Sequence, residues 1–315
     1  MKTVVITGCA GFIGSMVTQQ CLSMGWRVFG VDKFTYAANR AALENLNQYE
    51  NFSFIEADIC KIDRLPDCDY IINTAAESHV GNSIIDSSNF VQTNVEGVRN
   101  LLDLVRRKPD NIVSKPIFLH FSTDEVYGDG LEYATEKSSL NPSNPYSASK
   151  AAADLLIQAW HRTYDIDYVI VRPSNNYGPN QYPEKLIPLS VKLLQRGKKI
   201  RLHDKGEPTR TWLHTYDTAT AILTIIEKEV KNEIFNIAGN IEQKNIDTVR
   251  KIIKAYYNSE SNWEEKIDLD YRRQGQDARY NISDEKLKSY GWKPVMNFDE
   301  QIERLVDGYK RSFVW

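Results

Sequence analysis

The sequence predicts an α/β fold in which a doubly wound parallel sheet carries a smaller, interleaved C-terminal domain. Through the first half of the chain, short apolar runs alternate with longer segments whose apolar residues recur at helical spacing. The runs are apolar on both faces, which is typical of strands that helices cover from both sides. Strands that alternate with helices in this way indicate a parallel sheet. The 315 residues suffice for one large or two small domains.

The first half is expected to supply six strands and the helices between them. The strands are predicted at Thr3–Thr7, Arg27–Asp32, Phe52–Asp58, Tyr70–Ala75, Ile117–Ser122 and Asp167–Pro173. Two of the segments between them, Ser87–Arg107 and Pro145–Tyr164, have apolar residues at helical spacing and are predicted to be long helices.

The regular alternation of apolar runs and helical segments ends after the sixth predicted strand. A loop at Ser174–Asn180, a helix at Glu184–Arg196, a returning sheet strand at Glu233–Ala238 and an irregular, charged and aromatic stretch at Asn262–Tyr290 are expected there. We therefore expect residues 1–177 with 207–238 to form the sheet domain. Residues 178–206 with 239–315 are expected to form the smaller domain.

Composition excludes several classes of protein. The formal net charge of -3 gives no basic footprint for nucleic acid. The N-terminus lacks the order of residues found in a signal peptide, and no apolar run reaches the roughly 18 residues of a membrane span. We therefore expect a cytoplasmic protein that binds neither nucleic acid nor membrane. The four cysteines form no Cys-x-x-Cys pair and have no His at metal spacing, so no metal site is expected.

A glycine-rich turn follows the first strand. In Gly8-Cys-Ala-Gly11-Phe-Ile-Gly14, the glycines permit a tight turn and a close backbone approach to a pyrophosphate, which the following helix N-terminus faces. Asp32 ends the second strand 18 residues beyond Gly14. A carboxylate there accepts from a ribose 2′-hydroxyl and repels a 2′-phosphate, so NAD is the predicted cofactor. Lys33 follows directly and weakens this preference slightly.

A tyrosine and a lysine are spaced one helical turn apart. In Tyr146-Ser-Ala-Ser-Lys150, the i, i+4 spacing puts the phenol and the ammonium on one face of the predicted helix. A phenol near pKa 10 is a poor base at neutral pH, and a neighbouring ammonium favours its ionised form. Tyr146 is thus a candidate base for alcohol oxidation with Lys150 as its partner. Such a pair also occurs by chance in surface helices.

Two adjacent acids follow the fifth strand. Ser122-Thr-Asp-Glu-Val-Tyr-Gly128 lies where ligands bind in a doubly wound sheet, beyond the carboxyl end of a strand. Two carboxylates in different surroundings can separate into one acid and one base. A dehydration needs both, because a carbon-bound proton must be removed and a leaving hydroxyl must be protonated. Asp124 and Glu125 are therefore candidate catalytic groups, although a solvated acidic turn would have the same sequence.

These motifs together resemble dTDP-glucose 4,6-dehydratases, which belong to the extended short-chain dehydrogenase/reductase superfamily. The resemblance includes Asp32-Lys-Phe-Thr-Tyr-Ala37, Ala75-Ala-Glu-Ser-His-Val80, Pro173-Ser-Asn-Asn-Tyr-Gly-Pro179, Tyr182-Pro-Glu-Lys-Leu-Ile-Pro188, Trp212-Leu-His214 and Gly291-Trp-Lys-Pro294. It covers nearly the whole chain. It implies a Rossmann sheet for the first domain and a nucleotide-sugar-binding role for the second.

The resemblance also implies a mechanism. Tyr146, helped by Thr123 and Lys150, would remove the C4 hydroxyl proton of the sugar while NAD⁺ takes a hydride. Glu125 would then take the C5 proton and Asp124 would protonate the departing C6 hydroxyl. Return of the hydride to C6, with reprotonation at C5, would give an NDP-4-keto-6-deoxyhexose and restore NAD.

The resemblance assigns further binding residues. Those expected at the cofactor are Gly8, Gly11, Phe12, Ile13, Gly14, Asp32, Lys33, Thr35, Asp58, Ile59, Ala75, Ala76, Ser78, Thr93, Ser122, Tyr146, Lys150 and Asn176. Those expected at the substrate are Ser78, Thr123, Asn175, Lys185, Leu186, His203, Arg210, Asn240, Arg273 and Gln276. Arg210 and Arg273 are the candidate diphosphate clamps, since an arginine fork holds two oxygens at once.

Several positions depart from the family pattern. The departures lie at Val80-Gly-Asn-Ser83, His203, Arg210-Thr-Trp212, Asn240-Ile241 and Gly275-Gln-Asp-Ala-Arg279. They leave the nucleotide and the exact sugar open, but not the chemistry. The favoured substrate is dTDP-glucose, with UDP-glucose as its competitor. A nucleotide-sugar 4-epimerase would use the same tyrosine and NAD without the acid pair. A protein that binds NAD without catalysis would tend to lose Tyr146 or Lys150.

The family resemblance implies a homodimer. In it, the predicted helices Ser87–Arg107 and Pro145–Tyr164 of each subunit would pack into a four-helix bundle. The sequence itself shows only that both helices have wide apolar faces.

Overall fold

The computed structural model describes the chain except for residues 109–114, 130–131, 260–261, 272–277 and 312–315. Its largest sheet has seven strands, all parallel, in the order β10-β6-β5-β4-β1-β2-β3. These strands are β1 (Thr3–Thr7), β2 (Arg27–Asp32), β3 (Phe52–Glu56), β4 (Tyr70–Asn73), β5 (Ile117–Phe121), β6 (Tyr168–Pro173) and β10 (Glu233–Ile237). The predicted doubly wound parallel sheet is confirmed.

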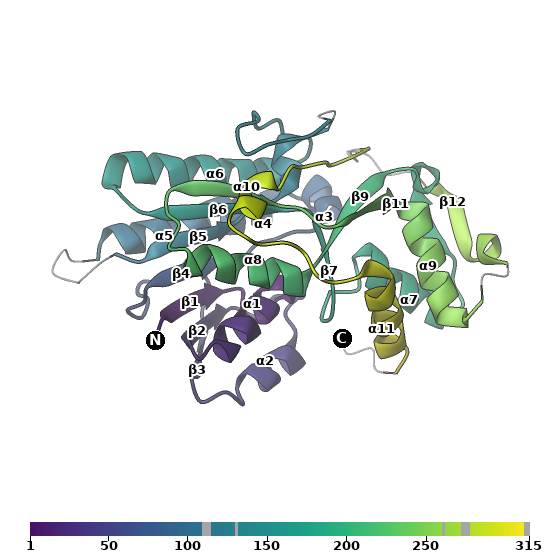
Figure 1. The fold of residues 1–315 in the computed structure, drawn as a ribbon, viewed down its shortest axis with the longest axis horizontal. Helices are drawn as coiled ribbons and strands as arrows, with labels where there is room; N and C mark the ends of the chain where they lie inside the picture. Colours follow the sequence, from purple (N-terminus) through teal and green to yellow (C-terminus); the bar gives the residue numbers. More distant parts are fainter. Residues whose placement is uncertain (109–114, 130–131, 260–261, 272–277, 312–315) are drawn as a thin grey trace.

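Helices cover both faces of this sheet (Figure 1). On one face α5 (Gly97–Arg106) and α6 (Pro145–Tyr164) pack on strand residues such as Val5 and Phe118. On the other face α1 (Phe12–Ser23) and α8 (Thr215–Glu227) pack on residues such as Ile6 and Leu119. Neighbouring strand residues thus serve opposite faces, which explains why the strands are apolar throughout.

The helix expected at Ser87–Arg107 has three parts. It consists of α4 (Ser88–Val91), one π-helical turn (Gln92–Glu96) and α5. The π turn contains Asn94, whose side chain bonds to both backbone groups of Glu77 and to the hydroxyl of Ser149. A π turn inside a helix shifts the side chains that follow it and often occurs near functional sites.

A second cluster of elements lies to the right of the sheet in Figure 1. Strands β11 (Ile241–Lys244), β9 (Thr209–His214) and β7 (Asn175–Tyr177) form one sheet, while β12 (Ile267–Tyr271) pairs with β8 (Ile200–His203). Helices α7 (Leu186–Gln195), α9 (Asn245–Tyr257) and α11 (Phe298–Arg311) share an apolar core with these strands. The shorter helices are α2 (Arg40–Leu46), α3 (Val80–Ile85) and α10 (Glu285–Ser289).

Part of the stretch expected to be irregular is ordered. Within Asn262–Tyr290, the described residues include β12 and α10. Strand β12 has the sequence Ile-Asp-Leu-Asp-Tyr, and only Ile267 in it is buried. A strand at an exposed edge carries little apolar signal, which is why the sequence did not reveal it.

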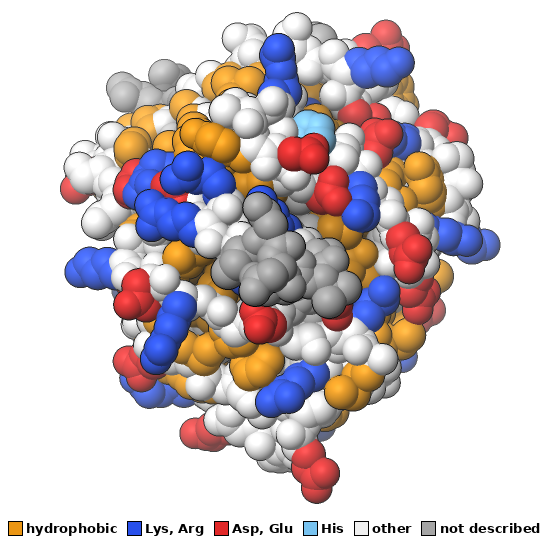
Figure 2. All heavy atoms as spheres, turned by 90° about the vertical axis from the view of Figure 1, so that its left-hand side faces the viewer, with side chains coloured by type: hydrophobic (Ala, Val, Ile, Leu, Met, Phe, Trp, Pro, Cys, Tyr) orange, Lys and Arg blue, Asp and Glu red, His pale blue; other side chains and the backbone are white. Residues whose placement is uncertain are grey.

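The strand order reverses between β1 and β4, where β2 and β3 lie on one side and β5 and β6 on the other. In open α/β sheets the crevice beyond the carboxyl ends of the strands at this point is the usual ligand site. At the opposite end of the molecule from the second cluster, acidic and basic side chains are intermixed on the surface (Figure 2).

Candidate active site

Two adjoining cavities lie beyond the carboxyl ends of the main strands. The first, of about 200 Å³, runs along the glycine turn, β2 and the end of β4. The second, of about 360 Å³, opens toward the smaller sheet. Both are lined by Phe12, Ile13, Ser122 and Tyr146. Tyr146 therefore lies at the boundary of the two cavities and can contact a ligand in either one.

The glycine turn is shaped for close approach. Gly8 has a φ of +73°, and a Cβ there would lie 2.8 Å from the backbone of Ala75. A Cβ on Gly14 would collide with the carbonyl oxygen of Gly8. Helix α1 therefore begins directly against the end of β1, with its free N–H groups toward the first cavity. This cradle fits a dinucleotide pyrophosphate.

Asp32 ties the end of β2 to the glycine turn. Its carboxylate accepts hydrogen bonds from the backbone N–H groups of Ala10 at 3.0 Å and Phe34 at 2.8 Å. Burial raises its pKa. Lys33 forms an ion pair with Asp58 at 3.3 Å. Asp58 therefore balances the positive charge of Lys33 at this end of the cavity. An acidic group that lines the ribose end of the cavity fits NAD.

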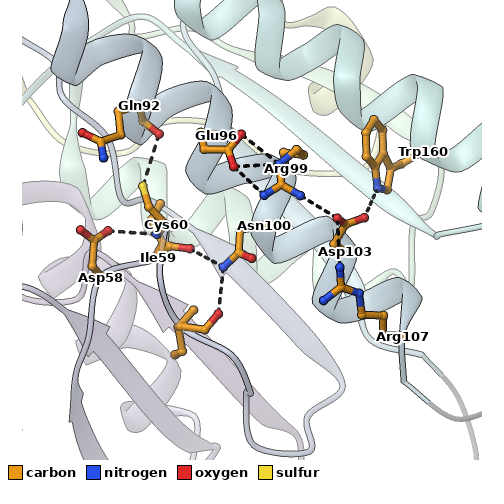
Figure 3. Close-up of polar contacts among 11 residues, drawn as sticks. Asp58, Ile59, Cys60, Gln92, Glu96, Arg99, Asn100, Asp103, Arg107 and Trp160 are labelled. Carbon is orange, nitrogen blue, oxygen red and sulfur yellow. Dashed lines mark hydrogen bonds and ion pairs between the residues drawn. The ribbon is translucent and has the colours of Figure 1, made fainter.

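The loop after β3 is fastened to the helical layer (Figure 3). The side-chain amide of Asn100 donates to the carbonyl oxygens of Ile59 and Ile62 at 2.8 and 2.9 Å. Asp58 accepts from the backbone N–H of Cys60 at 2.9 Å. Ile59 lines the cavity, whereas Asp58 lies behind the lining and holds Lys33 and Cys60.

Most of the residues predicted at the cofactor line the first cavity. They are Gly8, Gly11, Phe12, Ile13, Gly14, Asp32, Lys33, Thr35, Ile59, Ala75, Ala76, Ser78, Thr93, Ser122, Tyr146 and Lys150. Asn176 lines the second cavity instead and accepts a hydrogen bond from Thr218 at 2.6 Å. The binding roles of all these residues remain predictions.

Helix α6 presents Tyr146 and Lys150. Its N-terminus is fixed by Asn144, whose side chain accepts from the backbone N–H of Ser147, and by Pro145 in the first turn. Burial raises the pKa of Tyr146, as does the neighbouring charge of Glu125, while a hydrogen bond with Thr123 lowers it. Burial lowers the pKa of Lys150 to about 8, an effect that Asp154 opposes.

Asp124 and Glu125 begin a short 3-10 helix that covers Asp124–Tyr127. Asp124 is buried, and burial together with the charge of Glu125 raises its pKa to about 8. Glu125 is less buried, and its carboxylate lies 3.5 Å from the amide of Asn144 and 3.4 Å from the hydroxyl of Tyr280. Asp124 is thus suited to give a proton and Glu125 to take one.

The second cavity gathers most of the predicted substrate residues. Those that line it are Ser78, Thr123, Asn175, Lys185, Leu186, His203 and Arg210. The Lys185 ammonium donates to the carbonyl of Ser78 at 2.8 Å, and the Arg210 guanidinium lies 4.7 Å from the ring centre of Tyr280. Asn240 lies away from this cavity and donates to the carbonyl of Met296. Arg273 and Gln276 lie outside the described residues.

A third, larger cavity continues from the second. Its volume is about 1060 Å³, and it is lined by α3, α7 and the strand pair of β8 and β12. His203 and Tyr271 stand at its wall with ring centres 4.4 Å apart. The two cavities share His203 and Arg201, so a long ligand in the second could extend into the third.

Tyr280 is a site residue that the sequence did not indicate. It lines the second cavity and contacts both Glu125 and Arg210. Tyr280 directly follows Gly275–Arg279, a segment that departs from the family pattern. That position alone does not mark the tyrosine as a site residue. Its contact with Glu125 joins residues that are 155 positions apart.

A glycine-turn cradle on a doubly wound sheet, joined to a buried Tyr-x-x-x-Lys pair, defines an NAD-dependent short-chain dehydrogenase/reductase site. Comparison with known proteins narrows this class. A family model described as GDP-mannose 4,6 dehydratase matches residues 5–305. The dTDP-glucose 4,6-dehydratase 1 of Escherichia coli K12 is 37% identical over 99% of this chain and 94% of its own length. A probable dTDP-glucose 4,6-dehydratase of Sinorhizobium fredii is 40% identical with the same coverage. The chain belongs to the dTDP-glucose 4,6-dehydratase family.

Solved structures agree with this assignment. A dTDP-glucose 4,6-dehydratase from Streptomyces venezuelae, solved with NAD and TYD bound, has a TM-score of 0.89 at 35% identity and covers 98% of this chain and 97% of its own. A UDP-glucuronic acid 4-epimerase from Bacillus cereus has a TM-score of 0.90 at 23% identity, covering 98% of this chain and 99% of its own. That second likeness concerns the fold alone.

No helix of the described residues has both the length and the apolar character needed to cross a membrane. Among the same residues, no group of three or more His, Cys, Asp or Glu side chains could hold a metal ion.

Proposed function

We propose that the protein catalyses the NAD-dependent dehydration of dTDP-glucose to dTDP-4-keto-6-deoxyglucose. The observation that carries the proposal is that Tyr146, Asp124 and Glu125 line the second cavity, while Lys150 lines the adjoining first one. Tyr146 and Lys150 supply the means of alcohol oxidation, while Asp124 and Glu125 supply an acid and a base for loss of water. Its relatives at 37 and 40% identity bear the name of this activity.

The residues divide the work by their surroundings. Bound in the first cavity, NAD would supply reversible hydride chemistry for the sugar and would be unchanged by the whole cycle. Tyr146, as the phenolate that the Lys150 ammonium favours and with Thr123 as its hydrogen-bond partner, accepts the proton of the C4 hydroxyl. The resulting ketone acidifies the C5 proton, which the carboxylate of Glu125 takes. Asp124, protonated below about pH 8, gives its proton to the C6 hydroxyl, and water leaves.

Two contacts join segments around the first cavity and support retention of the cofactor. Lys185 crosses from the second domain to the carbonyl of Ser78, and the Tyr36 hydroxyl lies 3.5 Å from Glu184. Ser78, Glu184 and Lys185 line the first cavity.

The nucleotide diphosphate is assigned to the second and third cavities. The cations Lys185, Arg201 and Arg210 line the second cavity and suit a diphosphate. The paired rings of His203 and Tyr271 suit a flat base. This chemistry fits dTDP and UDP alike, and the names of the relatives favour dTDP.

The first experiment gives the enzyme dTDP-glucose and UDP-glucose in parallel in deuterated water. Mass spectrometry follows loss of water and uptake of deuterium at C5. We expect a 4-keto-6-deoxy product with one solvent deuteron at C5 and faster turnover of dTDP-glucose. Faster turnover of UDP-glucose would change the assigned nucleotide. An epimerised hexose without loss of water would refute the proposed reaction.

We further propose that residues 1–177 with 207–238 form the NAD-binding domain and that residues 178–206 with 239–315 form the nucleotide-sugar domain. Strand β10 extends the main sheet and α8 packs on α1, which supports assigning their segment to the first domain. Strand β9 pairs with β11 and β7 and so links the two.

We also propose that two copies associate through α5 and α6 as a homodimer. Supporting this, Leu155 on α6 and Val91 at the end of α4 are 59% and 54% exposed. Asp103 binds Arg99, Arg107 and the indole N–H of Trp160, which joins α5 to α6 (Figure 3). A rigid helix pair with exposed apolar side chains suits a bundle interface.

A further inference from the structure

A row of polar side chains crosses the main sheet beneath the site. Thr7 on β1 is paired in register with Asn73 on β4, and Asn73 with His120 on β5. The Thr7 hydroxyl lies 2.6 Å from the Asn73 amide, which lies 3.0 Å from Nδ1 of His120. All three are at most 1% exposed. Burial of such groups is costly unless each finds its hydrogen-bond partner.

The row ends on the ammonium of Lys150. Nε2 of His120 lies 3.2 Å from Nζ of Lys150. An ammonium can only donate, so Nε2 must accept if Lys150 is charged. A neutral imidazole that accepts at Nε2 carries its proton on Nδ1.

The proton on Nδ1 fixes the remaining partners. It must donate to an acceptor, so Asn73 presents Oδ1 to His120 and Nδ2 to the oxygen of Thr7. This is the reverse of the amide orientation in the structure, and an amide can be turned over without changing its shape. The opposite tautomer would let Nε2 donate to Lys150, which would then have to be an uncharged amine.

The charged groups around Lys150 leave Nε2 of His120 as an important hydrogen-bond acceptor for its ammonium. On the helix that carries Lys150, Asp154 follows it by one turn and favours its charged form, and Tyr146 precedes it by one turn. Asp154 is already paired with Arg172 of β6 at 3.0 Å. The charges of Asp124 and Glu125 raise the pKa of the Tyr146 phenol. His120 is therefore an acceptor for Lys150 that is not shared with a second cation.

We propose that His120 is a positioning residue for the reaction, which accepts a hydrogen bond from the Lys150 ammonium and so keeps it charged and aimed at Tyr146. With its amide turned over, Asn73 accepts from Nδ1–H of His120 and so fits the tautomer that can accept from Lys150. His120 lines none of the three cavities, so it acts through Lys150 rather than on the substrate. The expected effect on turnover rests on the proposed function, whereas the tautomer does not.

The tautomer can be observed directly. The chain has five histidines, so selective ¹⁵N labelling and long-range ¹H–¹⁵N spectra of the full-length protein give few signals. The signal that disappears in His120→Asn belongs to His120. We expect the neutral Nδ1–H form between pH 6 and 8. A neutral Nε2–H form, or a doubly protonated ring, overturns the inference.

Two matched variants test the consequence for catalysis. In His120→Gln the amide oxygen reaches the position of Nε2 and can still accept from Lys150, whereas in His120→Asn the amide reaches only as far as Nδ1. We expect kcat of His120→Asn to fall roughly 10- to 100-fold, the value of one hydrogen bond to a charged group, and that of His120→Gln to stay near the parent. KM for the nucleotide sugar and the bound NAD content should change little in either.

The pH profile separates positioning from structural support. If Lys150 loses its acceptor, its charged form is less favoured and no longer holds down the pKa of Tyr146. The acidic limb of kcat should therefore move to higher pH in His120→Asn and stay in place in His120→Gln. Equal losses in both variants with unmoved profiles would show that His120 only supports the fold, which overturns the inference.

The parent enzyme separates the two hypotheses. If the parent fails to dehydrate either nucleotide sugar while His120 is the Nδ1–H tautomer, the proposed function fails and the hydrogen-bond row stands. If the parent is active but the tautomer is reversed, the row fails and the function stands.

Discussion

Asp124 and Glu125 are neighbours in the sequence, yet the fold gives them different surroundings. Asp124 lines the second cavity but is buried, and burial raises its pKa to about 8, helped by the charge of Glu125. Glu125 has hydrogen-bond donors beside it in Asn144 and Tyr280. A pair placed in this way can hold one proton at neutral pH, which is the state that loss of water requires.

The raised pKa of Asp124 has a consequence for stability. The folded protein holds this proton more tightly than the unfolded chain, whose ordinary value is 3.8. The stabilisation is complete below about pH 4 and is lost as the pH rises through 8. Asp124→Asn cannot ionise, so its Tm relative to the parent should increase between pH 4 and 8 and then level off. Thermal unfolding with exposed Asp63→Asn as control checks this, and parallel curves at every pH would contradict it.

Glu125→Gln should stop one step of the reaction and leave the others. The amide cannot take a proton, so exchange of the C5 hydrogen with solvent should collapse. Binding of the nucleotide sugar should survive, because the cations of the second cavity are untouched. Deuterium incorporation at C5 in single turnovers measures the change. Exchange at the parent rate would mean that another group is the base.

At the scale of the element, α6 carries the site because its first turn is fixed. Asn144 and Ser147 form a reciprocal cap, and the Asn144 amide also reaches toward Glu125. Asn144→Ala should cost about 1 kcal/mol of unfolding free energy, the usual value of a lost cap. Asn144→Asp keeps the cap but puts a carboxylate near Glu125, so its stability should hold while kcat falls. Denaturant unfolding and turnover measurements distinguish the two variants. Equal stability of the parent, Asn144→Ala and Asn144→Asp would show that the cap does not stabilise the helix.

The sequence predicted those elements whose burial is evident locally. Thr3–Thr7 and Arg27–Asp32 were predicted to the residue, and so was Pro145–Tyr164. Strand β12 was missed because its pairing with β8 depends on contacts between distant segments. The same division holds at the site. Tyr146 and Lys150 are one helical turn apart and visible in the sequence, whereas His120 meets Lys150 from a strand 30 positions away.

At the scale of the whole molecule, the site depends on the interleaving of the chain. The Tyr–Lys pair and the acids come from the main sheet and its helix, while Lys185, His203 and Tyr280 come from later segments that close the second cavity. Strand β9 belongs to the smaller sheet and leads directly into α8, which packs on the main sheet. The main sheet and the second cluster of elements are therefore connected by the chain itself as well as by packing. A substrate that bridges the cavities must therefore contact both parts.

The proposed dimer is tested on the exposed face of α6. Leu155 is 59% exposed there, and a charge at this position would have to be desolvated in a helix bundle. Leu155→Glu should therefore shift the protein from dimer to monomer in light scattering at working concentration. Leu269→Glu on β12, a 37% exposed leucine in the second cluster of elements, is the matched control and should remain dimeric. A parent protein that is already monomeric would refute the dimer. A Leu155→Glu dimer as stable as the parent would place the interface on another face.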